Sequence, residues 1–263
     1  MTALPLIVDR QGQGPKLSLV HGWAMHSGLF DRLVSALGAC DVHRIDLPGH
    51  GQHREVAWPA TNDALVDQLA EAADGGVLAG WSLGGLLGLK VALAHPGRLK
   101  GLILIAATPC FAQRPHWPHG VPAPLVKQLA HELETGPEQV LNRFLALEVH
   151  GSEHAAADLK LLRQNAFRHG LPGRDALAAG LALLEDSDLT EQLVDLDLPV
   201  LLIGGRRDKL VSYDALEATA ARLPRARLLR IPGAAHAPFL TDTSAVAEGM
   251  QLFVEEVSEG ASP

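Results

Sequence analysis

The pentapeptide Gly80-Trp81-Ser82-Leu83-Gly84 constrains the fold more than any other part of the chain. The apolar run Val77–Ala79 before it is typical of a buried strand, and Leu83–Ala94 has the pattern of a helix. Glycines on both sides of the serine allow a turn that larger side chains would crowd. A strand that turns this sharply into a helix predicts a βα unit with Ser82 at the end of a strand.

Strand-like and helical patterns alternate before residue 111 and again after residue 190, which predicts a mostly parallel sheet with helices on both faces. Residues 111–190 contain helical patterns but no strand-like run, and prolines cluster at their start. We therefore expect one α/β core, residues 1–110 and 191–263, interrupted by a helical lid at 111–190. The expected strands are Leu17–Val20, Val42–Leu47, Val77–Ala79, Leu102–Ala106, Pro199–Ile203 and Ala226–Ile231. The expected helices are Asn62–Ala73, Leu83–Ala94, Leu141–Leu147, Leu159–Phe167, Ala176–Leu184, Asp214–Leu223 and Thr243–Val257.

Charge and cysteine content exclude several classes of protein. The formal net charge of −8 argues against general binding to nucleic acid or to a membrane surface. The chain has only 2 cysteines, which is typical of a reducing compartment. Its start lacks the pattern of a signal peptide, and its strongest apolar run is too short to span a bilayer. We expect a cytoplasmic protein, most simply a monomer.

A serine hydroxyl becomes a useful nucleophile only when a base takes its proton and an acid orients that base. After a serine on a strand–helix turn, the acid and the histidine follow in that order along the chain. Asp208 comes just after the strand-like run Pro199–Ile203, and His236 just after Ala226–Ile231. Both therefore lie where α/β sheets place their sites. The rival acids Asp186 and Asp188 have no strand before them, and the histidines of the insertion have a surface pattern: His116, His119, His150, His154 and His169.

Attack on a carbonyl group creates a negative oxygen that needs hydrogen-bond donors in place. One expected donor is the backbone N–H of Leu83, directly after the serine, and the second is that of Trp23 in the early segment His21-Gly22-Trp23. The turn Asp46–Gly51 is interpreted as structural, and Cys110 as a buried apolar residue. This chemistry needs neither a metal nor a cofactor. The predicted fold class is therefore the α/β-hydrolase fold, and the predicted triad is Ser82, Asp208 and His236.

Six segments of the chain carry a family resemblance: His21–Trp23, Asp46–Gly51, Gly80–Gly85, Thr108–Phe111, Arg143–Leu147 and Ala235–Phe239. In this order they resemble the pimeloyl-[acyl-carrier protein] methyl ester esterase family of biotin synthesis, and the resemblance covers the chain from Gly12 to about Phe253. The resemblance implies hydrolysis of the methyl ester of pimeloyl-acyl-carrier protein. It also implies substrate contacts by Trp23, Ser82, Leu83, His236 and the segment Phe144, Leu145, Ala146, Leu147 and Glu148.

The resemblance further implies that basic lid residues hold an acidic acyl carrier protein. Arg143 and Lys160 match that pattern, whereas Gln139 and Ala156 stand where the family has arginine. Glu148 likewise stands where the family has glutamine. Docking could instead use other lid cations, namely Arg163, Arg168 or Arg174.

Three other functions fit the same motifs. One is a broad-specificity short-chain carboxylesterase without a carrier partner. Another is a hydrolase that cleaves carbon–carbon bonds in diketone-like substrates. The third, from a different class, is a ligand-binding protein on this fold that no longer turns over, although an intact triad argues against it.

Overall fold

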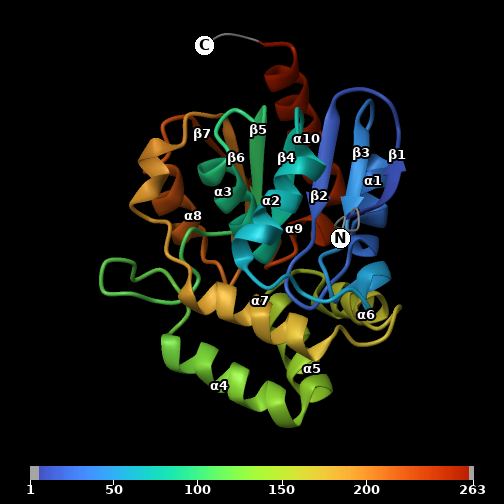
Figure 1. Ribbon diagram of the computed structural model, residues 1–263, viewed down its shortest axis with the longest axis vertical. Coiled ribbons are helices and arrows are strands. Elements are labelled where there is room, and N and C mark those ends of the chain that lie inside the picture. Colours follow the sequence, from blue (N-terminus) through green and yellow to red (C-terminus); the bar gives the residue numbers. More distant parts are fainter. Residues whose placement is uncertain (1–5, 261–263) are drawn as a thin grey trace.

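The computed structural model describes residues 6–260, and a seven-stranded sheet forms the centre of this part of the chain (Figure 1). The strand order is β1-β3-β2-β4-β5-β6-β7. Strands β2 to β7 run parallel, and β1 pairs with β3 in the antiparallel sense at one edge. The bounds are β1 Ile7–Gln11, β2 Lys16–Val20, β3 Asp41–Ile45, β4 Val77–Trp81, β5 Gly101–Ile105, β6 Val200–Gly205 and β7 Ala226–Ile231.

Side chains of the central strands alternate between two hydrophobic clusters, one on each face of the sheet. In β5, Leu102 and Leu104 pack in one cluster, whereas Ile103 and Ile105 pack in the other. This alternation follows from the two-residue period of a strand. Because both faces are covered, every residue of β5 is buried, which explains the continuous apolar run in its sequence.

Helices cover both faces of the sheet. The first cluster includes side chains of α2, α3 and α8, and the second includes side chains of α1, α9 and α10. The helix bounds are α1 Asp31–Ala36, α2 Asn62–Ala73, α3 Leu83–Ala94, α8 Tyr213–Ala220, α9 Pro238–Thr241 and α10 Thr243–Ser258. Short 3-10 helices span η1 Ser27–Phe30, η2 Gly51–His53 and η3 Gln192–Asp195.

Four helices lie between β5 and β6 in the sequence. They gather beyond one end of the strands, in the lower half of Figure 1. They are α4 Ala123–Thr135, α5 Pro137–Glu148, α6 Ala155–Ala166 and α7 Arg174–Asp186. Proline stands in the first turn of α4 and of α5, where its missing N–H has no partner to lose. Residues 123–186, which contain these four helices, are called the helical segment.

The predicted fold class is confirmed, and all six predicted strands are present with ends that differ by at most two residues. Several elements were not predicted: β1 and α1 near the start of the chain, α4, and the short helix α9. The strand β1 has the sequence IVDRQ, whose pattern is mostly polar because an edge strand is only partly covered. Within residues 6–260, no helix is both long enough and apolar enough to cross a membrane.

Candidate active site

Ser82 occupies the sharp turn between β4 and α3, as its sequence context predicts. Its backbone has φ of 53° and ψ of −115°, a strained conformation for a residue with a side chain. A side chain at Gly80 would overlap the backbone of Gly84, and one at Gly84 would overlap the carbonyl oxygen of Val20. Both glycines are therefore required for the first turn of α3 to pack against the end of β2, and this packing presents Ser82 at the sheet edge.

Three predicted residues from three different loops meet at this edge. Nε2 of His236 lies 3.0 Å from Oγ of Ser82, and Nδ1 of His236 lies 2.7 Å from Oδ2 of Asp208. All three side chains are buried. The arrangement is a continuous hydrogen-bonded chain from hydroxyl to imidazole to carboxylate, the geometry of a nucleophile, its base and the group that orients the base.

Backbone groups fix the acid in place. Oδ1 of Asp208 accepts the N–H groups of Leu210 at 2.8 Å and Val211 at 3.0 Å, so only Oδ2 faces the imidazole. A side chain at Gly205 would overlap the carbonyl oxygens of Ala234 and Ala235. Glycine at the end of β6 therefore lets the loop that carries Asp208 approach the loop that carries His236.

Two residues that hold the backbone of His236 were not predicted to do so. The N–H of His236 donates to the carbonyl of Glu148 at 2.9 Å, and Nε1–H of Trp81 donates to the carbonyl of His236 at 2.8 Å. No role was expected for Trp81 from the sequence, and the family resemblance implied only a substrate contact for Glu148. Trp81 lies 155 residues from His236 in the sequence, and Glu148 lies more than 80 residues from it. No local sequence pattern signals bonds over such separations.

The Glu148 side chain lies in an unusual environment for a carboxyl group. It is 1% exposed, and its Oε2 has no hydrogen-bond partner among residues 6–260. Burial, followed by the charge of nearby Asp208, raises the pKa of Glu148 well above its ordinary value. The environment therefore favours the protonated form of Glu148, which is neutral and similar in shape to glutamine.

The two expected oxyanion donors lie beside the serine. Leu83 follows Ser82 directly, and β2 pairs with β4 so that Val20 lies opposite Gly80, which places the His21–Trp23 segment next to the turn. A Cβ on Gly22 would come within 3.3 Å of Cβ of Ser82. Neither Leu83 N–H nor Trp23 N–H has an acceptor among the hydrogen bonds of residues 6–260, so both are available to an oxygen from outside the chain.

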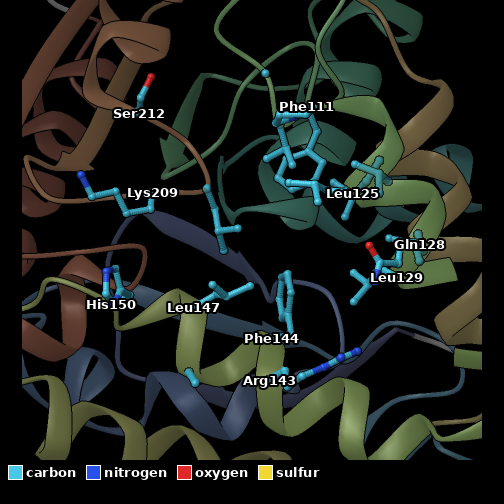
Figure 2. Close-up of a pocket in the computed structure, with 18 of the residues that line it drawn as sticks. Phe111, Leu125, Gln128, Leu129, Arg143, Phe144, Leu147, His150, Lys209 and Ser212 are labelled. Atoms are coloured by element: carbon cyan, nitrogen blue, oxygen red, sulfur yellow. The ribbon is translucent and has the colours of Figure 1, made fainter. Parts of the chain in front are cut away.

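Some side chains of the segment 144–148 line a cavity of about 670 Å³, and others do not. Phe144, Ala146 and Leu147 line that cavity, whereas Leu145 packs in the core cluster and Glu148 reaches the site through its backbone. Figure 2 shows Phe144 pointing into the cavity, with His150, Lys209 and Ser212 on one side and Leu125, Gln128 and Leu129 on the other. Ser82 does not line the cavity, but Phe144 contacts Trp23 edge-on, with ring centroids 4.9 Å apart.

The expected docking cations differ in their surroundings. Arg143 forms an ion pair with Glu132, and Arg168 with Asp31. Lys160 is exposed, and no carboxylate of residues 6–260 lies within ion-pair distance of it. Arg163 and Arg174 are likewise exposed without a carboxylate partner in this part of the chain. The structure therefore leaves Lys160 better placed than Arg143 to meet an acidic partner.

The remaining candidates lie away from the triad. Asp186 is exposed, and Asp188 binds His116 at 2.7 Å and Thr190 rather than a catalytic base. Cys110 is buried, and burial raises the pKa of its thiol to about 11, which does not suit a nucleophile. Among residues 6–260, no group of three or more histidine, cysteine or acidic side chains could hold a metal ion.

Comparison with known proteins agrees with this fold. A family model for the alpha/beta hydrolase fold matches residues 15–243, so the chain belongs to the alpha/beta hydrolase family. Within it, the chain is 44% identical over 252 residues to the pimeloyl-[acyl-carrier protein] methyl ester esterase of Stenotrophomonas maltophilia, covering 95% of this chain and 97% of that protein. It is 43% identical over 251 residues to the esterase of the same name from Xanthomonas oryzae pv. oryzae, covering 95% and 99%.

Solved structures that resemble this one share its fold at lower identity. An esterase from Exiguobacterium antarcticum superposes with a TM-score of 0.85 at 21% identity, covering 97% of this chain and 100% of that one. A thermophilic esterase from Thermogutta terrifontis gives a TM-score of 0.80 at 23% identity, covering 95% and 93%. At these identities the likeness shows the fold alone.

Proposed function

We propose that this protein is a serine carboxylesterase that hydrolyses the methyl ester of pimeloyl-acyl-carrier protein in biotin precursor synthesis. The observation that carries this proposal is the hydrogen-bonded chain Ser82–His236–Asp208 next to an apolar cavity. The substrate in this proposal is inferred from the relatives named above, because the sequence identity to them extends over nearly the whole of both chains.

The proposed reaction begins when Oγ of Ser82 attacks the ester carbonyl and His236 Nε2 takes the hydroxyl proton. Asp208 keeps the Nδ1–H tautomer of His236 and stabilises the imidazolium that forms. The N–H groups of Leu83 and Trp23 bind the oxyanion. His236 then protonates the departing methoxide, so methanol leaves and the acyl group stays on Ser82.

Water completes the cycle. His236 takes a proton from water as the water oxygen attacks the acyl-enzyme, and it returns that proton to Oγ of Ser82. The products are the regenerated enzyme and a free carboxylic acid on the pimeloyl chain, which ionises to the carboxylate by releasing its proton to solvent. Each proton transfer to or from Ser82, methoxide and the attacking water passes through His236, so the scheme uses no metal and no organic cofactor.

The helical segment is proposed to be a lid over the acyl chain. Its cavity is lined mainly by apolar side chains from α4, α5 and α7, among them Leu125, Leu129, Phe144 and Leu181. Since Ser82 is only 6% exposed, an ester must displace side chains near Trp23 and Phe144 to reach it. A closed apolar cover would exclude bulk water from the acyl-enzyme.

The carrier protein is proposed to dock on the helical segment through Lys160, with Arg143 in a secondary role. An exposed lysine without a carboxylate partner can attract an acidic protein from solution. The charge reversal Lys160→Glu should reduce turnover of the carrier-linked ester and leave that of the free methyl ester unchanged. We also propose a monomeric, cytoplasmic enzyme, which light scattering and cell fractionation would test.

The central test compares Ser82→Ala with the wild type on two substrates, pimeloyl methyl ester on acyl carrier protein and the same ester without the carrier. The expected result is that the variant loses activity on both and that the wild type prefers the carrier-linked ester. A variant that retained wild-type turnover would contradict the triad. Equal efficiency of the wild type on both substrates would favour the broad-specificity carboxylesterase. Rescue of a biotin auxotroph that lacks the esterase tests the role in the cell.

A further inference from the structure

His21 is a buried titratable side chain at the end of β2 that takes no part in the reaction proposed above. It is 0% exposed, and its ring joins two backbone groups. Nδ1 lies 2.8 Å from the carbonyl oxygen of Gly22, and Nε2 lies 2.9 Å from the N–H of Leu47. Both ring nitrogens therefore have a partner, and each partner belongs to the main chain.

These two partners define the tautomer of the ring. The N–H of Leu47 can only donate, so Nε2 must be the acceptor and the ring proton must be on Nδ1. Nδ1–H then donates to the carbonyl of Gly22. Burial and the neighbouring His50 lower the pKa of His21 to about 3, so the ring is neutral under ordinary conditions and keeps this arrangement.

The carbonyl of Gly22 belongs to the same peptide unit as the N–H of Trp23. In a planar trans peptide the C=O and the N–H point in opposite directions, so a bond that fixes one fixes the other. The described residues contain no cis peptide. A hydrogen bond to the carbonyl oxygen also polarises the peptide and strengthens its N–H as a donor.

This peptide unit lies in a strained loop beside the nucleophile. Gly22 is next to Ser82, and Ala24, two residues further on, has φ of 63°, a value unusual for alanine. A strained loop that carries a catalytic donor needs something to hold its orientation. On one side the N–H of Trp23 has no acceptor within residues 6–260. On the other side the carbonyl accepts the shorter bond from His21, at 2.8 Å, and a longer one from the N–H of Met25, at 3.3 Å.

We propose that His21 is a positioning residue for the oxyanion hole: its Nδ1–H holds the Gly22–Trp23 peptide so that the N–H of Trp23 points at the ester oxygen. The proposal rests on the esterase activity proposed above. It differs from a purely structural role because only the Nδ1 bond acts on the donor peptide. The Nε2 bond to Leu47 anchors the turn that follows β3 and has no direct effect on that peptide.

Two substitutions separate the two bonds. The side-chain amide of His21→Asn reaches the position of Nδ1 and can donate to Gly22, but it cannot reach Leu47. The longer amide of His21→Gln reaches the position of Nε2 and can accept from Leu47, but it leaves the Gly22 carbonyl with only the longer bond from the N–H of Met25, at 3.3 Å. We expect His21→Gln to lower kcat by about 10- to 100-fold, less than the loss of a whole donor, and His21→Asn to lower it far less. KM should change little in both.

The decisive readout is the ratio of kcat/KM for a methyl ester to that for the matching thionoester, in which sulfur replaces the carbonyl oxygen. Sulfur accepts hydrogen bonds poorly, so this ratio reports on the oxyanion donors. It should fall in His21→Gln and stay near the wild-type value in His21→Asn. His50→Gln is the matched control, since it alters the same buried cluster without touching Gly22, and its ratio should not change.

Equal losses in His21→Asn and His21→Gln that follow their thermal midpoints, with an unchanged ratio, would overturn the proposal. A ratio that falls equally in His50→Gln would also overturn it. If the variants fail to fold, 15N NMR of histidine-labelled wild type still decides: the proposal requires the Nδ1–H tautomer at His21, and an Nε2–H tautomer contradicts it. An inactive wild type, or an active Ser82→Ala, would instead contradict the esterase function.

Discussion

The indole Nε1–H of Trp23 donates to the carbonyl oxygen of Leu177 at 2.8 Å, which ties the loop after β2 to helix α7. Contact between the two is close, because a Cβ on Gly180 would lie 2.9 Å from Cδ1 of Trp23 and 3.1 Å from Cδ2 of Leu83. The residue that supplies an expected oxyanion donor through its backbone thus holds the helical segment through its side chain. A change in the position of α7 should therefore affect the oxyanion hole.

Trp23→Phe removes this bond and keeps an aromatic side chain in place. We expect the free energy of unfolding to fall by about 1 kcal/mol, the usual net value of one hydrogen bond. Turnover should fall modestly, because the backbone N–H of residue 23 remains but α7 is less firmly held. Urea unfolding and steady-state kinetics measure both effects.

Trp117→Phe is the matched control for that experiment. Trp117 is also buried, but its Nε1 has no hydrogen-bond partner within residues 6–260. The substitution therefore removes an unsatisfied N–H, and turnover should stay at the wild-type level. Equal effects on turnover in the two variants would show that the bond to Leu177 does not matter for activity.

Glu148→Gln should stabilise the protein, and the gain should depend on pH. The folded-state pKa of Glu148 is raised above 4.5, the value expected in the unfolded chain. The folded state therefore binds more protons than the unfolded state above that pH, so stability falls as pH rises through this window. Replacing the carboxyl by an amide removes this cost. Thermal unfolding should show a gain near pH 7.5 that disappears toward pH 4.

Glu138→Gln on the same helix is the control. Glu138 is exposed, so this substitution removes a carboxylate that is in contact with water and not one that is buried in the folded state. Its effect on the melting temperature should vary little with pH. Activity of Glu148→Gln should remain within a few-fold of wild type, since the bond to His236 uses the backbone of residue 148. A gain that is the same at pH 4 and pH 7.5 would contradict a raised pKa of Glu148.

Three buried histidines near the loop after β2 should weaken the fold in mild acid. Burial lowers the pKa of His21 to about 3, that of His50 to about 4, and also that of His26. Because the unfolded state takes up these protons from about pH 6.5 downward, stability is full above that pH and falls below it. Each histidine adds a slope of up to about 1.4 kcal/mol per pH unit.

Urea unfolding between pH 7.5 and pH 5 measures this slope, in a window where most carboxylates stay ionised. His50→Gln should reduce the slope, because a group that no longer titrates is removed. An exposed histidine gives the comparison: His154→Gln should leave the slope unchanged. The prediction fails if the slope is the same in His50→Gln as in the wild type.

The sequence was sufficient to predict six of the strands and to place the three candidate triad residues at one edge of the sheet, for a physical reason. Parallel strands place their carboxyl ends at one sheet edge, so residues just after such strands must meet there, as Ser82, Asp208 and His236 do. The edge strand β1 was missed because it is half covered and its sequence carries little apolar alternation. The supports of His236 were missed because Trp81 and Glu148 reach it through single long-range bonds.

In the helical segment, too, the sequence did not show which individual residues face the cavity. A resemblance assigned five consecutive residues, 144–148, to the substrate, yet consecutive positions on a helix point in different directions. Phe144 and Leu147 are three apart and line the cavity together, whereas Leu145 points into the core. Helical periodicity would have separated these positions, but it could not have shown that the carbonyl of Glu148 bonds to His236.

Asp208→Asn should abolish most activity while preserving the fold. The N–H groups of Leu210 and Val211 require an acceptor at the Oδ1 position, so the amide oxygen must take that place. The amide NH2 then faces Nδ1 of His236, which becomes an acceptor and moves the ring proton to Nε2. An imidazole protonated at Nε2 cannot accept the proton of Ser82, so kcat should fall by about 10⁴-fold, as in other triads.

Asp158→Asn is the control for removing a buried carboxylate. Asp158 is 3% exposed and accepts hydrogen bonds from the hydroxyl groups of Ser152 and Thr241, and it has no hydrogen bond to His236. We expect this variant to lose some stability and to keep its turnover. If Asp208→Asn retained more than about a tenth of wild-type kcat, where the tautomer argument requires a loss of about 10⁴-fold, then the carboxylate would not set the tautomer of His236. Another acidic group would then have to orient the base. Glu148 would be the first such residue to mutate, because its backbone already contacts His236.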